Sequence, residues 1–424
     1  MKEEIIVFIL VSPIIIYLLF VILFKNFSIG FTIIMFILPF ENLLGTGESG
    51  SISRYLIILT GVGCFLQKIL ILNKVSIFKE PIFNLFLTLI FWSFASIIWS
   101  VSPETSLVTT ITLVGNFILF SIVFLSNRKW LSIYWISLLI GCTSSIILGN
   151  FLPRPEGLEN NLDRFTTGGQ DPNDLAGLLL IAFSVGVYVF YSQLKSKRSR
   201  FLMFFNLATI FIGVLLTLSR TGLIAMVVPL SFLALRKFEK KNYFHLIILL
   251  FTSILYILGM DTINEFLNLF ISPLFSRFNQ LNESQFASAR WDIWLAAIEV
   301  IKHNFVLGVG AGALPYVIDD YSSVILPRST YNPEIGLVAH NIILSVWSEM
   351  GLIGITIFVT ILFFGFQYTL NLSKKDPWGL GMLVSILVVF VMGTTLSWEN
   401  KKILYILFGS ICVLYKSKKD YLDD

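Results

Sequence analysis

The stretch AHNIILSVWSEMGLIGITIFVTILFFGFQY, from Ala339 to Tyr368, decides the class of fold. It opens with polar residues and continues as an apolar run longer than the about 20 residues that cross ~30 Å of hydrocarbon. Such runs recur throughout the chain, because 56% of its 424 residues are hydrophobic and only 13% are charged. The mean hydropathy of +0.84 lies well outside the range of soluble domains. This composition predicts an all-α polytopic membrane protein.

Apolar segments of membrane-spanning length follow one another along the whole chain, and we expect about 12–13 transmembrane helices. The predicted segments are Ile5–Phe24, Phe27–Phe40, Ile52–Leu72, Ile82–Trp99, Thr105–Ser126, Trp130–Leu152, Asp174–Leu194, Phe201–Leu218, Thr221–Leu235, Tyr243–Met260, His340–Tyr368, Trp378–Leu396 and Ile403–Tyr415. The first is too long for a secretory signal and no small-residue cleavage site follows it, so it should remain as a helix.

Two long hydrophilic stretches interrupt this pattern and divide the chain into four parts. These are N-terminal transmembrane helices (1–152), central helices with a loop at 153–173 (153–260), a large loop (261–339) and C-terminal helices (340–424). Alternate connections are rich in lysine, and cytoplasmic loops retain positive charge. This pattern predicts an outer N-terminus, a cytoplasmic C-terminus, and both hydrophilic stretches on the extracytoplasmic side.

Arginine rather than lysine dominates the predicted outer side. The outer arginines are Arg54, Arg154, Arg164, Arg220, Arg277, Arg290 and Arg328. Arginine suits bidentate recognition of phosphate better than lysine does. The same pattern would also arise if lysine simply accumulated on the inner side.

The motif GGQDPNDLAG, Gly168–Gly177, marks the point where the first outer loop returns to the membrane. Asp171 fits the N-cap of the next helix, and Asp174 fits the acidic third position of a capping box. Helix capping alone would explain both residues. A helix N-terminus is also a ready site for an anionic or polar sugar ligand, and Arg164 would add a cation there.

The motif LTLSRTGLIAM, Leu216–Met226, is a hydrophobic hairpin whose only charged residue is Arg220. An arginine in so tight an outer turn either reaches lipid phosphate by snorkelling or has a specific partner. In the second case it would supply a fixed cation for a substrate pyrophosphate.

The motif SARWDIWLAAIEVIKHN, Ser288–Asn304, predicts an amphipathic helix within the large loop. Its apolar residues at helical spacing are Trp291, Trp294, Leu295, Ile298 and Ile301. The two tryptophans favour a position at the membrane interface. Arg290, near the start, would point toward a ligand at the membrane surface or pair with an acidic neighbour.

The sequence contains no convincing motif for a nucleotide or metal cofactor. LGVGAGALP, Leu307–Pro315, has glycines spaced as in a dinucleotide loop, but no predicted strand precedes it and no GK[ST] follows, so we expect a tight surface turn. There is no HExxH motif and no Cys/His cluster, and all three cysteines lie in apolar segments. We therefore expect no metal site, no cofactor and no nucleic-acid partner.

The most informative local pattern is AHNIILSVWSEMGLIG, Ala339–Gly354. His340 stands where the large loop ends and a membrane helix begins, and it opens a stripe of polar residues formed by Asn341, Ser345, Ser348 and Glu349. Such a stripe should face protein or a watery cavity rather than lipid. Because histidine titrates near neutrality, His340 could remove a proton from a substrate hydroxyl. A lone histidine can equally be structural.

Taken in order, GGQDPNDLAG, LSRTGLIA, ARWDIWLAAIEVIKHNFVLGVGAGAL and AHNIILSVWSEMGLIG resemble the O-antigen ligase and O-antigen polymerase superfamily of bacterial membrane glycosyltransferases. The resemblance covers about Arg164 to Gly354. It implies a fold of about a dozen helices with a large periplasmic loop. It also implies a catalytic role for His340 and binding of pyrophosphate or glycan by Arg220, Arg290, Arg164, Asp174 and Asn173.

The resemblance implies an enzyme of the bacterial cytoplasmic (inner) membrane that acts at its outer, periplasmic face. Its donor would be an undecaprenyl-pyrophosphate-linked glycan and its acceptor a glycan or lipid-linked saccharide, with the lipid bilayer and a chain-length regulator protein as further partners. We expect it to polymerise repeat units of O-antigen, capsule or exopolysaccharide by metal-independent inverting transfer. An O-antigen ligase that transfers the glycan to another acceptor, such as lipid A core, and a transporter or flippase for lipid-linked sugar are the alternatives.

Overall fold

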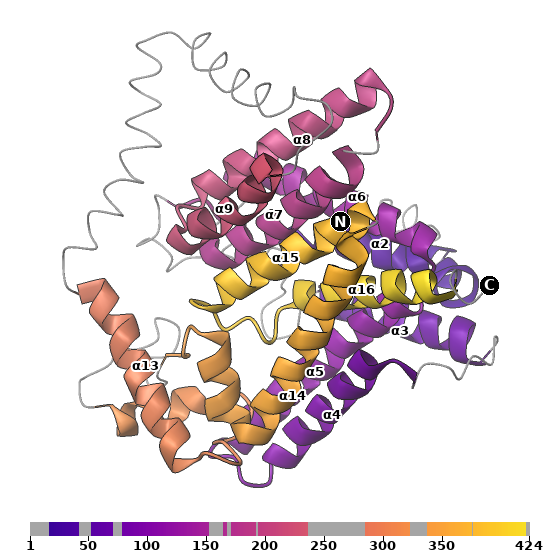
Figure 1. The fold of residues 1–424 in the computed structure, drawn as a ribbon. Helices are drawn as coiled ribbons and strands as arrows, with labels where there is room; N and C mark the ends of the chain where they lie inside the picture. Colours follow the sequence, from indigo (N-terminus) through magenta and orange to yellow (C-terminus); the bar gives the residue numbers. More distant parts are fainter. Residues whose placement is uncertain are drawn as a thin grey trace, which may run out of the picture.

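The computed structural model describes residues 17–41, 52–70, 79–151, 164–167, 171–191, 194–235, 285–322, 337–374 and 376–420. Every regular element within these ranges is a helix, which confirms the predicted all-α class (Figure 1). The predicted segment Tyr243–Met260 lies outside the described residues. The same is true of most of the first segment, Ile5–Phe24.

Long apolar helices form the main body of the molecule. Five of the described helices are long and apolar enough to cross a membrane, or six if a bent N-terminal pair is one span. The five are α5 (Pro103–Phe124), α6 (Arg128–Leu148), α7 (Pro172–Val185) with its continuation to Phe190, α8 (Lys197–Leu216) and α14 (Ile342–Ser373). Shorter helices are α2 (Phe27–Ile37), α3 (Ile52–Cys64), α4 (Pro81–Ser96), α9 (Arg220–Leu235), α15 (Pro377–Gly393) and α16 (Lys402–Asp420). Their positions match the predicted segments closely, and the chain is a multi-pass membrane protein.

The N-terminal pair differs from two successive straight spans. Tyr17–Lys25 and Phe27–Phe40 meet at an angle of 117°. Only Asn26 separates the two segments, and its side chain caps α2 by accepting a hydrogen bond from Ser28 N (3.1 Å). The predicted segments Ile5–Phe24 and Phe27–Phe40 are therefore joined by a sharp bend at Asn26.

Helix α7 lies in the interior of the bundle. Every residue from Leu175 to Phe183 is buried. Its neighbours are α6, α8, α9 and α15. A helix that is apolar on all faces is stable only when other helices surround it. This central position fixes the polar N-terminus of α7, with Asp171 and Asp174, at one end of the bundle.

Helix α14 is broken at Gly351, whose φ of 65° and ψ of −168° belong to a region that is essentially restricted to glycine. The break frees the carbonyl groups of Ser348 and Glu349, which accept hydrogen bonds from Val309 N and Gly310 N, each 2.9 Å long. The expected surface turn of LGVGAGALP is therefore wrong in its location. The backbone of this segment, Leu307–Pro315, which we call the glycine loop, fills the kink, and Val309 is only 3% exposed.

Helix α13 (Gln285–His303) is the amphipathic helix predicted in the large loop, and it lies beside α14 (Figure 1). Most of the apolar residues expected at the membrane interface are exposed, and other residues of α13 face the protein. The residues packed against the glycine loop and the following short helices are Ile293, Ala296, Ala297 and Val300. In contrast, Trp291, Leu295 and Ile298 are exposed. Ala296 and Ala297 allow close packing on the protein, and Trp291, Leu295 and Ile298 lie on the exposed side.

Candidate functional site

Three helices, α7, α9 and α14, begin at neighbouring positions, and a side chain caps each N-terminus. Asp171 accepts hydrogen bonds from two backbone N–H groups of α7 (2.7 and 3.3 Å). Asn341 does the same for α14 (2.9 and 3.1 Å), and Ser219 accepts one N–H bond in α9 (3.1 Å). The cap at Asp171 confirms the prediction from the sequence.

Hydrogen bonds also connect the three N-termini to one another. The hydroxyl that caps α9 donates to Asn173 Oδ1 on α7 (2.7 Å). Thr221 on α9 contacts Thr395 hydroxyl to hydroxyl (2.7 Å), and Asn341 donates to the carbonyl of Thr394 (3.2 Å). The positive ends of three helix dipoles therefore gather in one place, an arrangement that favours a bound anion.

Arg164 braces this region. Its Nε donates to the carbonyl of Thr217 at the end of α8, and one terminal nitrogen donates to Asn173 Oδ1, both at 3.0 Å. Two predicted site residues, Arg164 and Asn173, are thus in direct contact. These contacts hold the turn between α8 and α9 against the start of α7.

His340 has an unusual backbone conformation. Its φ of 49° lies in the left-handed region, which few residues other than glycine adopt. The carbonyl of the preceding residue, Ala339, accepts a hydrogen bond from Trp294 Nε1 of α13 (3.0 Å). The following residue, Asn341, caps α14. The backbone of His340 is therefore held between two fixed neighbours.

The electrostatic environment of His340 includes both arginines of the predicted site. Burial lowers the pKa of His340, the Arg290 cation lowers it further, and the carboxylates of Asp171 and Asp174 oppose the shift. Burial likewise lowers the pKa of Arg290, with Asp171 opposing and the Arg220 cation adding to the decrease. The structure thus brings His340, Arg290, Arg220 and Asp171 into one electrostatic cluster. At neutral pH the imidazole is mainly uncharged and can accept a proton.

Asp174 is fixed by two contacts that the sequence analysis overlooked. It accepts hydrogen bonds from Trp398 Nε1 (2.8 Å) and Lys401 Nζ (2.5 Å). Burial lowers the pKa of Lys401, but the carboxylates of Asp174, Asp171 and Glu399 together outweigh burial and the net shift is upward. The polar run SWENKK, Ser397–Lys402, between two apolar segments was the signal available in the sequence.

The polar stripe of α14 faces protein, as predicted. Ser345, Ser348 and Glu349 are at most 4% exposed. Ser345 donates to Glu399 Oε1 (2.8 Å), and Glu349 accepts from Gly312 N (2.7 Å). These contacts connect the stripe to the loop before α16 and to the glycine loop.

Of the other two histidines, the structure describes only His303. His303 bonds the carbonyl of Glu299 within α13 through Nδ1 (2.9 Å), and His245 lies outside the described residues. Among the described residues, no three His, Cys, Asp or Glu side chains form a group that could hold a metal ion.

Together these features define a class: an all-helical, multi-pass membrane protein with a capped, cationic polar site at one end of its bundle. Residues 205–359 match the family model described as O-antigen ligase. The match confirms the resemblance of this segment to the O-antigen ligase and polymerase superfamily. It includes Arg220, Arg290 and His340 but not Arg164, Asn173 or Asp174. No curated protein matches the chain closely enough to add to this.

Proposed function

We propose that this protein is a membrane glycosyltransferase that polymerises undecaprenyl-pyrophosphate-linked repeat units at the outer face of the bacterial inner membrane. The observation that carries the proposal is the cluster of two arginines, three helix N-termini and a neutral histidine. Such a cluster suits a substrate that has an anionic headgroup and a proton to be removed.

The donor pyrophosphate lies against Arg220 and Arg290 in this proposal. Cleavage of the bond between the anomeric carbon and the pyrophosphate oxygen leaves negative charge on the leaving group. Two arginines and the positive ends of α7, α9 and α14 stabilise that charge without a metal. Arg164 and Asn173 keep the helix ends in register, so they act as positioning residues.

His340 acts as the general base. The acceptor hydroxyl attacks the anomeric carbon from the side opposite the pyrophosphate and gives its proton to the neutral imidazole. One O–H bond and one C–O bond break, one glycosidic C–O bond forms, and undecaprenyl pyrophosphate leaves. Direct displacement inverts the anomeric configuration.

The ligase alternative uses the same chemistry with another acceptor, such as lipid A core. A flippase is less well supported, because transporters place polar sites near the bilayer midplane. Here Arg220 opens α9, His340 lies just before α14, and both act electrostatically on or with Arg290.

The test is incubation of the pure protein with lipid-linked repeat units alone. A ladder of products identifies a polymerase, whereas conversion only after another acceptor is added identifies a ligase. Movement of substrate across the bilayer without a new bond would refute enzymatic transfer.

Variants of two histidines test whether His340 is the general base. His340→Ala should insert normally and lose about 100-fold or more of the transfer rate, the usual contribution of a general base. His340→Asn should do the same, and because asparagine tolerates a positive φ it separates chemistry from backbone strain. His303→Ala is the matched control on the exposed face of α13. Normal transfer by both His340 variants would show that the assigned base is wrong.

A further inference from the structure

A polar pocket lies next to the arginine and histidine cluster but is built from other residues. It encloses about 150 Å³ and is lined by Leu38, Glu41, Asp171, Asp174, Leu178, Trp398, Lys401, Lys402 and Ile403. The lining comes from the end of α2, the start of α7 and the loop that leads into α16. This volume is enough for several water molecules or one small polar ligand.

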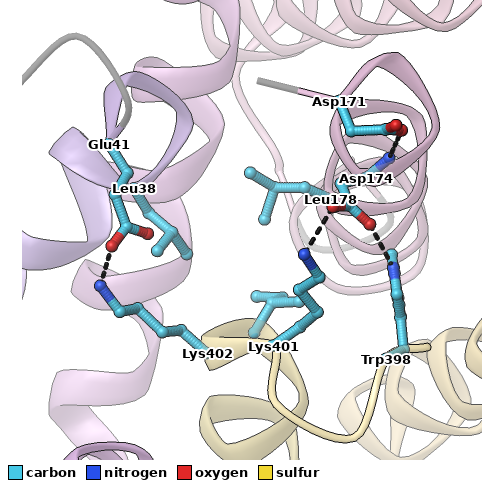
Figure 2. Close-up of a pocket in the computed structure, with 9 residues that line it drawn as sticks. Leu38, Glu41, Asp171, Asp174, Leu178, Trp398, Lys401 and Lys402 are labelled. Atoms are coloured by element: carbon cyan, nitrogen blue, oxygen red, sulfur yellow. Dashed lines mark hydrogen bonds and ion pairs between the residues drawn. The ribbon is translucent and has the colours of Figure 1, made fainter. Parts of the chain in front are cut away.

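Two ion pairs face each other across the pocket, as Figure 2 shows. On one wall Lys401 binds Asp174 (2.5 Å), and on the other Lys402 binds Glu41. Trp398 holds Asp174 from below with its indole N–H (2.8 Å), and Ser53 contacts Lys402 Nζ (3.1 Å). The polar groups are therefore fixed before any ligand arrives.

The charge of the pocket suits a neutral ligand better than a second phosphate. Lys401 and Lys402 are balanced by Glu41, Asp171 and Asp174, which leaves one excess negative charge. A lysine ammonium has three donors and a carboxylate about four acceptor sites, and each pair uses only part of this capacity. Sugar hydroxyls, which both donate and accept hydrogen bonds, match such a surface.

Asp171 and Asp174 connect the pocket to the proposed chemistry. Both carboxylates line the pocket, and both act electrostatically on His340. Arg220, Arg290 and His340 do not line it. Asp171 thus connects the pocket to His340 and also acts on Arg290, so the pocket adjoins the site proposed for the donor pyrophosphate.

From this arrangement we propose that the pocket between Lys401–Asp174 and Lys402–Glu41 binds the acceptor sugar ring whose hydroxyl His340 deprotonates. The inference rests on the proposed transfer reaction and divides its site into two halves, with pyrophosphate at the arginines and acceptor hydroxyls at the ion pairs. The proton passes from the acceptor hydroxyl to His340, and the acceptor oxygen forms the new bond to the anomeric carbon of the donor.

The test separates the two halves with two probes. One is undecaprenyl pyrophosphate without sugar, and the other is the repeat-unit oligosaccharide released from its lipid by mild acid. Glu41→Gln and Lys402→Gln should weaken binding of the oligosaccharide by about tenfold or more, because each removes a charged hydrogen-bonding group. Binding of undecaprenyl pyrophosphate should not change.

A charge swap distinguishes ligand binding from folding. The double variant Glu41→Lys/Lys402→Glu keeps an ion pair between the two positions, so it should recover any lost thermal stability while oligosaccharide binding stays weak. Recovery of both would show a purely structural pair and overturn the inference. Lys302→Gln, which removes the exposed ion pair with Glu299 on α13, is the control and should leave both probes unaffected.

Two other results would overturn the inference. Weaker binding of undecaprenyl pyrophosphate by Glu41→Gln would place the donor headgroup in this pocket. Unchanged oligosaccharide binding in all pocket variants would mean that the acceptor lies elsewhere. Neither result would remove the transfer reaction itself, which the histidine comparison tests separately.

Discussion

Gly351→Ala should damage both the stability and the activity of the protein. Gly351 adopts a backbone conformation that only glycine tolerates, and forcing another residue into such a region costs about 1–3 kcal/mol. A Cβ atom at this position would stand 2.1 Å from Val306 O and 2.4 Å from Val306 C, both backbone atoms that cannot rotate away.

The protein can relieve this clash only by moving the glycine loop. That movement strains the bonds Val309 N to Ser348 O, Gly310 N to Glu349 O and Leu352 N to Phe305 O, each 2.9 Å long. Each bond contributes about 1 kcal/mol. We therefore expect a loss of about 3 kcal/mol or more, which for a chain of this size is about a 3 °C fall in Tm.

Activity should fall as well, because the same loop connects α13 and its Arg290 to α14 and His340. The assay is thermal unfolding of the purified protein in detergent together with the rate of glycan transfer. Gly115→Ala is the matched control, since a Cβ at Gly115 in α5 meets nothing within 4 Å. Equal Tm and equal rate in the two variants would refute the reasoning that the kink positions the site.

Further predictions concern the charges and caps of the site. In the proposed mechanism transfer depends on neutral His340, so the rate should be lost as pH falls through the pKa of His340. Arg290→Gln removes a cation that lowers this pKa and should move the acidic limb of the pH–rate profile to higher pH. Asp171→Asn keeps a good helix cap but removes an anion that raises the pKa, so the limb should move to lower pH, and a shift in the same direction for both variants would contradict the electrostatic account. Ser219→Ala removes the cap of α9 and the bond to Asn173, and it should cost about 1–2 kcal/mol, seen as a lower Tm; an unchanged Tm would show that this bond is dispensable.

The sequence predicted the class of fold and most helix positions, because long apolar runs leave a membrane protein little choice of structure. The sequence also predicted the N-cap of α7, because Asp171 fits that position by residue type alone. The sequence also suggested Arg220, Arg290 and His340 as one group, although their roles remain predictions.

Local sequence patterns could not predict the long-range contacts. Nothing near Glu349 indicates that the amide of Gly312 would bind it, since that contact depends on the kink at Gly351. Periodicity predicted that α13 is amphipathic, but it did not indicate which of its residues pack against the protein. Small residues such as Ala296 and Ala297 instead make the close contact with the protein.

The acceptor pocket was missed for a similar reason. Glu41, Asp174 and Lys402 are far apart in the sequence, and each looks like an ordinary charge at a helix end. Only the packing of α16 against the N-terminal helices brings Lys402 to Glu41 and Ser53. Pairing of that kind depends on tertiary structure rather than on spacing.

The most direct test of the central claim is the affinity of the purified protein for undecaprenyl pyrophosphate. If the two arginines hold the pyrophosphate, Arg220→Gln and Arg290→Gln should each weaken binding by about tenfold or more, the loss of a charge-assisted contact. Arg198→Gln, an exposed arginine at the opposite end of α8, should bind as the wild type does. Equal affinity in the wild type and both site variants would contradict the account.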